Sequence, residues 1–103
     1  MEIKIAYRHL ESTPSIDEKI REKAEKLKKF FDGKMHVDWT CSVEKDVHSS
    51  EVKVTGDHFT YHASAEADSL YKTIDESVHK LEKQILKKKE MLKSKKRDEP
   101  HFE

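Results

Sequence analysis

The chain of 103 residues is 34% hydrophobic and 41% charged, and its 21 Lys and Arg residues balance its 21 Asp and Glu residues. A single domain of this size buries about two-thirds of the surface that its unfolded chain exposes, which leaves little room for a deep catalytic cavity. No apolar run reaches the roughly 18 residues that a membrane-spanning helix needs. The one cysteine, Cys41, cannot form an internal disulfide, so we expect a cytoplasmic protein.

The first predicted element is a short half-buried strand over residues 3–7, where apolar residues alternate with others. A helix is predicted between residues 12 and 33, because both of its ends carry helix signals. Thr13 is suited to the cap, Pro14 to the first helical position, and Gly33 to the position after the end. The apolar residues recur at steps of three and four and share one helical face. They are Ile16, Ile20, Ala24, Leu27 and Phe31.

Three strands are predicted in the middle of the chain. Residues 35–43 alternate most clearly between apolar and polar side chains. A polar connection over residues 44–51 then leads to a strand around residues 52–54. A tight turn at Gly56 joins it to a further alternating strand over residues 59–65. Strands joined this closely predict an antiparallel meander.

A second amphipathic helix is predicted to follow Ser69, which can cap it. Its apolar residues fall within a narrow arc at about 100° per residue. They are Leu70, Ile74, Val78, Leu81, Ile85 and Leu92. The predicted fold class is α+β, in the order β-α-β-β-β-α, with a four-stranded mixed sheet and two amphipathic helices packed on one face. Residues 1–97 form a single domain in this scheme, and residues 98–103 form a short disordered tail.

No sequence pattern indicates an enzyme, a metal site or a bound cofactor. His58 and His62 would lie roughly 13 Å apart along one strand face, and no third ligand follows at zinc-like spacing. Cys41 lies on an apolar strand face, where a small buried hydrophobe is a simpler interpretation than a nucleophile. The two glycines of the chain cannot form a glycine-rich phosphate loop. We therefore expect a binding protein with no catalytic residues, no cofactor and no metal ligands.

Positive charge is concentrated in residues 69–97. This segment holds ten basic residues against four acids, so it carries +6 while the remainder of the neutral chain carries −6. The basic residues are Lys72, Lys80, Lys83, Lys87, Lys88, Lys89, Lys93, Lys95, Lys96 and Arg97. Any single lysine is explained as a solvated helix position, but a soluble helix usually mixes both signs. A helix end this basic is typical of proteins that bind polyphosphate.

Lysines of the first helix extend the predicted basic surface. Lys19, Lys23 and Lys26 follow one flank of its apolar stripe. The aromatic residues of the strands share the parity of the core, so the predicted contact with nucleic acid depends on shape and phosphate. Two alternatives remain from composition alone. Binding to an anionic membrane is the less favoured alternative, because the apolar arc of the helix is needed to cover the sheet. Binding to an acidic protein partner is the second-ranked function after nucleic-acid binding.

Residues 8–32 and 62–93 contain several specific motifs. They are Arg8-His9-Leu10-Glu11, Thr13-Pro14, Lys26-Leu27-x-Lys29-Phe30-Phe31, Tyr71-x-x-Ile74-Asp75 and Lys80-Leu81-x-Lys83-Gln84. With these motifs the chain resembles the ribosome hibernation promoting factor family. That family includes the ribosome-associated inhibitor protein Y, and its older description is sigma-54 modulation protein. The resemblance covers residue 1 to about residue 95, and the family's fold matches the predicted order of elements.

The resemblance implies a non-enzymatic factor of stationary phase and stress that binds the small ribosomal subunit and regulates translation. Family members occupy the decoding channel, where messenger RNA and the A- and P-site transfer RNAs would lie, and some promote inactive ribosome dimers. The implied partner is 16S-type ribosomal RNA. The candidate RNA-binding residues are Arg8, Lys23, Lys26, Lys28, Lys80, Lys83, Lys87, Lys88 and Lys89. The alternative function is that of a sigma-54 modulation type regulator, which would bind an acidic protein partner.

The chain departs from the family pattern at four positions. Tyr7 stands where Gly is common, Ser69 where Asp is usual, Leu70 where Met is usual, and His79 where an acid is common. Ser69 remains a good cap, so the helix start is unaffected. The short length resembles the short hibernation factors, which act beside a separate ribosome modulation factor. We expect a monomer in isolation, because no long apolar edge is evident.

Overall fold

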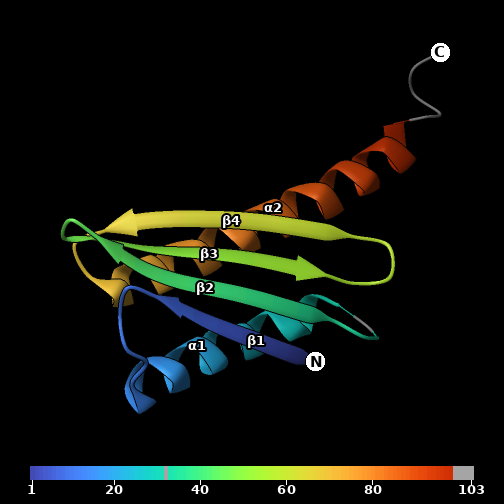
Figure 1. The fold of residues 1–103 in the computed structure, drawn as a ribbon. Helices are drawn as coiled ribbons and strands as arrows, with labels where there is room; N and C mark the ends of the chain where they lie inside the picture. Colours follow the sequence, from blue (N-terminus) through green and yellow to red (C-terminus); the bar gives the residue numbers. More distant parts are fainter. Residues whose placement is uncertain (32, 99–103) are drawn as a thin grey trace.

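The structure, a computed structural model, describes residues 1–31 and 33–98, with side chains as far as Lys88. Its elements are β1 (Glu2–Arg8), α1 (Pro14–Leu27), the 3₁₀ helix η1 (Lys28–Phe30), β2 (His36–Glu44), β3 (Val47–Thr55), β4 (Thr60–Ala67) and α2 (Leu70–Asp98). The four strands form one sheet in the order β1-β2-β3-β4. β1 runs parallel to β2, and the other neighbours are antiparallel (Figure 1). The predicted α+β class and element order are confirmed.

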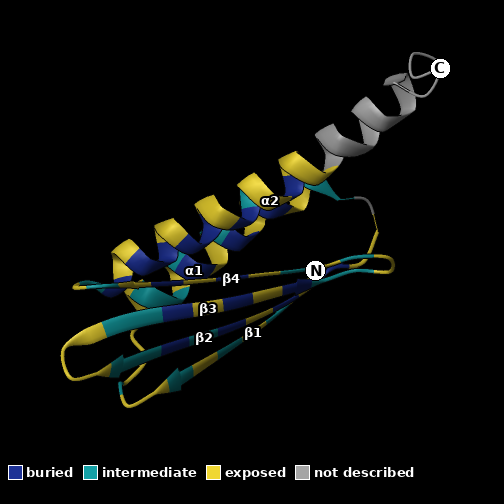
Figure 2. Cartoon of the chain, turned by 90° about the horizontal axis from the view of Figure 1, so that it is seen from above, coloured by how far each residue is buried: buried dark blue, intermediate teal, exposed yellow. Residues whose placement is uncertain are grey.

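Both helices cover the same face of the sheet, as Figure 2 shows. The core between the two layers is made by the buried faces of both helices and by alternate residues of the strands. Its largest fully buried side chains include Trp39, Ile20, Leu27, Ile74, Leu81 and Ile85. Each fully buried side chain of this size contributes about 1.5–3 kcal/mol to folding. The predicted arc of α2 is confirmed through Ile85, and Leu92 lies outside the described side chains.

The first helix begins where the sequence predicts and ends earlier. The Ile16 backbone N–H donates to Thr13 Oγ1 at 3.2 Å, and Pro14 occupies the first helical position. The α-helix ends at Leu27, and η1 continues it for three residues. Phe31 is then extended, with φ −133° and ψ 142°, and its ring stacks on Phe59 instead of continuing the helical face.

The connection between β2 and β3 is much shorter than expected. The sequence predicts a polar connection over residues 44–51, whereas β3 already begins at Val47 and pairs with β2 along its whole length. Lys45 and Asp46 form the turn with φ values of 49° and 67°. Two successive positive φ values are those of a two-residue hairpin turn. The prediction was wrong because Lys-Asp lacks the Asn-Gly or Asp-Gly signature of such turns.

A chain of buried hydroxyl groups fixes α2 against β3. Ser50 Oγ and Thr73 Oγ1 are 2.8 Å apart, and Thr73 Oγ1 donates to the Leu70 carbonyl at 2.6 Å. Ser77 Oγ donates to the Thr73 carbonyl at 2.6 Å. These polar groups are fully buried, and each hydroxyl has a partner, which avoids the cost of an unsatisfied buried group. The network therefore sets the position of α2 on the sheet.

The division of the chain into a domain of residues 1–97 and a disordered tail of residues 98–103 stays a prediction. The helix α2 continues to Asp98, and residues 99–103 lie outside the described part of the chain.

Replacing Thr13 by Ala should lower the free energy of unfolding by about 1 kcal/mol, because the Ile16 N–H loses its cap. Urea denaturation of the two proteins measures the difference. Thr13→Ser is the matched control, since its hydroxyl can still accept the bond and the loss should be only a few tenths of a kcal/mol. Equal destabilisation by Ala and Ser would contradict the capping role.

Candidate nucleic-acid interface

The solvent-facing side of α2 carries the main group of candidate residues. Its buried arc holds the helix on the sheet, so the side chains on the opposite arc point to solvent. Lys83 and Lys87 are exposed there, whereas Lys88, seven residues after Leu81, is exposed at the end of the buried arc, and α2 continues past the end of the sheet (Figure 1). The backbone of α2 includes Lys89, whose side chain lies outside those described. The helix therefore presents a row of cations that is not covered by the described protein.

Lys23 is less exposed than the other candidate residues whose side chains are described, and it pairs with a carboxylate of the other helix. Its Nζ lies 3.2 Å from Asp75 Oδ1, and the Lys23 side chain is only 19% exposed. The hydrogen bond to Asp75 raises the pKa of Lys23 above its ordinary value of 10.5. Lys23 therefore links α1 to α2, while Lys26 and Lys28 of the same region remain exposed.

Lys80 lies at the edge of the sheet. Its Nζ donates to the Ser64 carbonyl at 2.8 Å, and Gln84 Nε2 donates to the His62 carbonyl at 2.8 Å. Both carbonyls belong to β4, the outer strand next to α2. An ammonium group has three donors, so the bond to Ser64 leaves two donors of Lys80 for another ligand.

Arg8 is separated from the candidate residues of α1 by the sheet. It lies at the end of β1 on the face that the helices leave open, in register with Ser42. Arg8 and Lys80 line opposite sides of one hollow of about 410 Å³. The rest of the lining is mainly hydroxyl and carboxylate groups, from Thr40, Ser42, Ser49, Ser50, Glu51, Ser64, Ala65 and Glu66.

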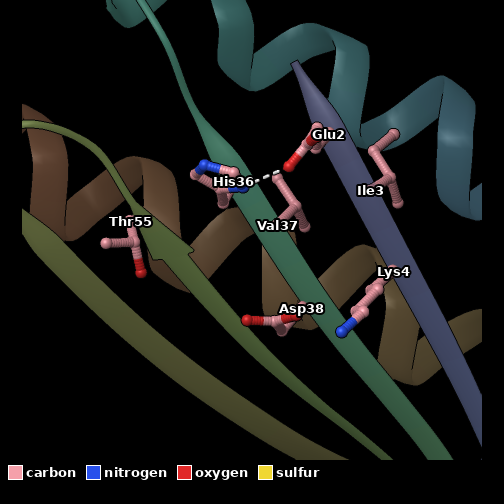
Figure 3. Close-up of a pocket in the computed structure, with 7 residues that line it drawn as sticks. All are labelled: Glu2, Ile3, Lys4, His36, Val37, Asp38 and Thr55. Atoms are coloured by element: carbon pink, nitrogen blue, oxygen red, sulfur yellow. Dashed lines mark ion pairs between the residues drawn. The ribbon is translucent and has the colours of Figure 1, made fainter.

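The open face of the sheet is mixed in charge and slightly acidic. A hollow of about 680 Å³ lies at one end of the β1–β2 pair. Figure 3 shows residues that line it, including His36 and Glu2, whose Nδ1 and Oε1 atoms are 2.7 Å apart. Lys4 is in register with Asp38 there. By strand alternation, five carboxylates and three cations of the described strands lie on this face. They are Glu2, Asp38, Glu44, Glu51 and Glu66, against Lys4, Arg8 and Lys53. Phosphate is therefore attracted more strongly to the helical side of the protein.

The structure gives no support to catalysis at Cys41. The side chain is fully buried, and burial raises the pKa of its thiol to about 11, which keeps it protonated at neutral pH. Within the described chain, no group of three His, Cys, Asp or Glu side chains is arranged to hold a metal ion. His62 lies 3.8 Å from Glu51 as an exposed pair on the open face.

Sequence reasoning missed a group of aromatic rings at one end of the core. Phe31, Phe59 and Tyr61 share the parity of the core, yet all three side chains remain partly exposed. Lys88 Nζ lies 5.8 Å from the centre of the Tyr61 ring. The adjacent lysines and phenylalanines at residues 28–31 were the available signal, since basic and aromatic residues are often combined where RNA binds.

Comparison with known proteins places this arrangement in one family. Residues 3–93 match the family described as "Sigma 54 modulation protein / S30EA ribosomal protein". The chain belongs to this family. It is 33% identical over 93 residues to the ribosome hibernation promoting factor of Escherichia coli K12, covering 90% of this chain and 98% of the relative. The Salmonella typhimurium factor is 31% identical over 93 residues, with the same shares covered.

Two solved structures share the fold. The Thermus thermophilus Protein Y N-terminal domain has a TM-score of 0.77 and 26% identity, covering 82% of this chain and 96% of that domain. A ribosomal subunit interface protein from Coxiella burnetii has a TM-score of 0.76 and 25% identity, covering 86% of this chain and 98% of that protein. The resemblance stated from the motifs is therefore confirmed.

Family membership also bears on the general kind of function. The family and the relatives are named as ribosomal proteins, ribosome hibernation factors and a ribosomal subunit interface protein, which agrees with the expectation of a binding protein. None of the helices in the described part of the chain combines the length and the apolar character that crossing a bilayer requires. The RNA-binding residues themselves stay predictions.

A double-mutant cycle with Lys23→Met and Asp75→Asn should give a coupling free energy of about 1 kcal/mol at pH 8, at the upper end for surface pairs because Lys23 is mostly covered. The raised pKa of Lys23 means that this stabilisation is fully present below pH 10.5 and is lost as the pH rises through the folded-state pKa. Urea unfolding at several pH values measures both effects.

The pair Lys72 and Asp68 is the control for this cycle. Its Nζ–Oδ1 distance is 3.0 Å, but the two side chains are 64% and 79% exposed, so its coupling should be clearly smaller than that of Lys23 and Asp75. Coupling at Lys23 and Asp75 no larger than this would show that the interhelical contact does not stabilise the fold.

Proposed function

We propose that this protein is a cytoplasmic ribosome hibernation factor that inhibits translation by binding the small subunit in its decoding channel. The bound protein occupies the space of messenger RNA and of the A- and P-site transfer RNAs, so inhibition requires no chemistry. The observation that carries the proposal is the row of exposed lysines on α2 in a chain of this family. Its relatives include proteins named for ribosome hibernation and for the ribosomal subunit interface.

The contacts proposed with 16S-type ribosomal RNA fall into two groups. Lys26, Lys28, Lys83, Lys87 and Lys88 are exposed, so they are proposed to contact phosphate directly, although Lys28 also lies 3.8 Å from Glu25 and Lys88 lies beside the Tyr61 ring. The second group consists of Lys23, Lys80, Arg8 and Lys89. Lys23 already pairs with Asp75, and Lys80 already donates to the Ser64 carbonyl. Arg8 lies on the open face, and Lys89 belongs to α2. Lys23 and Lys80 are proposed to add positive potential from fixed positions.

The uneven charge of the two faces supports one orientation. The helical side carries the lysine row, whereas the open face of the sheet carries more carboxylates than cations. Phosphate would therefore be attracted more strongly to the helices than to the open face, where Arg8 is the one candidate contact. We propose that the protein is a monomer in isolation and promotes inactive ribosome dimers together with a separate ribosome modulation factor.

Changing both Lys83 and Lys87 to Gln should weaken binding to purified small subunits. Each lost phosphate contact reduces the slope of log affinity against log salt by about 0.9 for a duplex backbone, so the double variant should flatten the slope by about 1.8. Melting curves should change little, since both side chains are exposed. Binding measured over a salt series tests the expectation.

The double variant Lys4→Gln, Lys53→Gln is the matched control, because it removes the same charge from the open face. Its affinity and salt slope should stay close to those of the unchanged protein. If the two double variants behave alike, the helical side is not the RNA-binding surface. If the unchanged protein fails to bind small subunits but recovers a sigma factor from ribosome-depleted lysate, the sigma-54 modulation alternative replaces the proposal.

A further inference from the structure

Three aromatic rings meet at the end of the core that lies beneath the later part of α2. Phe31 follows η1, Phe59 lies in the loop between β3 and β4, and Tyr61 lies in β4. The rings of Phe31 and Phe59 are stacked, with centroids 4.1 Å apart and an interplanar angle of 8°. Tyr61 is tilted against both, at 6.0 Å and 5.6 Å. We call these three residues the aromatic corner.

The loop between β3 and β4 is shaped to hold the Phe59 ring. A Cβ atom at Gly56 would lie 2.0 Å from Phe59 Cε2, so any larger residue would displace the ring. The Gly56 N–H also donates to the Phe59 carbonyl at 3.0 Å, which closes the loop. The loop therefore leaves the Phe59 ring packed directly against the Gly56 backbone.

One side of each ring packs against the core, and part of each ring remains in contact with solvent. All three pack against the buried core, and none of them is itself buried. Burial raises the pKa of Tyr61 above its ordinary value, so its hydroxyl stays protonated and the ring uncharged at neutral pH. Part of this uncharged aromatic surface is thus open to solvent at the end of the molecule.

Positive charge lies beside this surface. Lys88 Nζ is 5.8 Å from the centre of the Tyr61 ring, and Lys29 Nζ is 5.3 Å from the centre of the neighbouring Phe30 ring. Lys88 comes from α2, directly after Lys87 of the lysine row. The corner therefore offers aromatic planes and cations together, which favours a ligand that is flat in one part and anionic in another.

We propose that the aromatic corner stacks an unpaired nucleobase of an RNA strand whose phosphates are held by the adjacent lysines of α2. This inference rests on the proposed function and adds a base contact to a site otherwise based on phosphate. Single-stranded RNA is bound in this way, because every base has an aromatic face and stacking tolerates any sequence. Lys88 is placed to bind the phosphate of the stacked nucleotide while remaining close to Tyr61.

The test uses the full chain and two short single-stranded RNA oligonucleotides of equal length. One carries ordinary bases, and the other carries abasic ribose at its central positions, so the two have the same charge. The unchanged protein should bind the base-bearing strand roughly 5- to 150-fold more tightly, which is the range for one stacked base. In Tyr61→Leu and Phe59→Leu, this preference should fall toward one, while affinity for the abasic strand is retained.

Tyr71→Leu is the matched control, because Tyr71 is a 44% exposed tyrosine in the first turn of α2, far along the helix from Lys88. It should keep the full preference. Proton NMR of the unchanged protein adds a measurement that does not depend on whether the variants fold. The ring protons of Tyr61 and Phe59 should shift with the base-bearing strand and remain in place with the abasic strand.

Equal affinity of the unchanged protein for both strands, without shifts of these ring protons, would overturn the inference. Retention of the preference in folded Tyr61→Leu and Phe59→Leu would overturn it too, because the base would then stack elsewhere. Either result leaves binding to small subunits, measured with the Lys83 and Lys87 variant, as a separate outcome. The two proposals can therefore fail independently.

Discussion

The structure depends on covering one apolar face of a four-stranded sheet with only two helices. Only 34% of the chain is hydrophobic, and most of the large apolar side chains that the structure describes are packed in this single interface. The arc of α2 from Leu70 to Ile85 supplies much of it, and the hydroxyl network around Thr73 fixes the position of the helix. With this arc packed on the sheet, Lys83 and Lys87 lie on the outer side of the helix.

This constraint separates two kinds of polar surface. The helical layer carries cations, some of them neutralised within the fold, as Lys23 is by Asp75. The open face of the sheet carries charges of both signs on neighbouring strands, with Lys4 in register with Asp38. A protein that is neutral as a whole can therefore present a strongly basic side to a polyanion. Overall charge is a poor guide to what such a molecule binds.

Local signals allowed much of the fold to be predicted. Thr13 and Pro14 determine the start of α1 through neighbouring backbone groups. In α2, apolar residues recur at helical spacing over several turns, which made this helix predictable. The end of α1 at Leu27 was not predicted. Phe31, which the helical pattern included, is extended and stacks on Phe59, a residue distant in sequence. The partner of Lys23 was hidden for the same reason, since helix packing brings it to Asp75. Charge pattern indicates a basic side but not which charges are already paired.

The contact of Lys80 and Gln84 with β4 has a consequence for how the protein behaves when it is concentrated. An outer strand with free carbonyl groups is a template on which another chain can add a strand, and such addition begins aggregation. Here the carbonyls of Ser64 and His62 are occupied by side chains of the helix that covers the sheet. The helix therefore disfavours the addition of a strand from another chain along this edge. Lys80, a residue of the basic side, therefore also helps to keep the protein from aggregating.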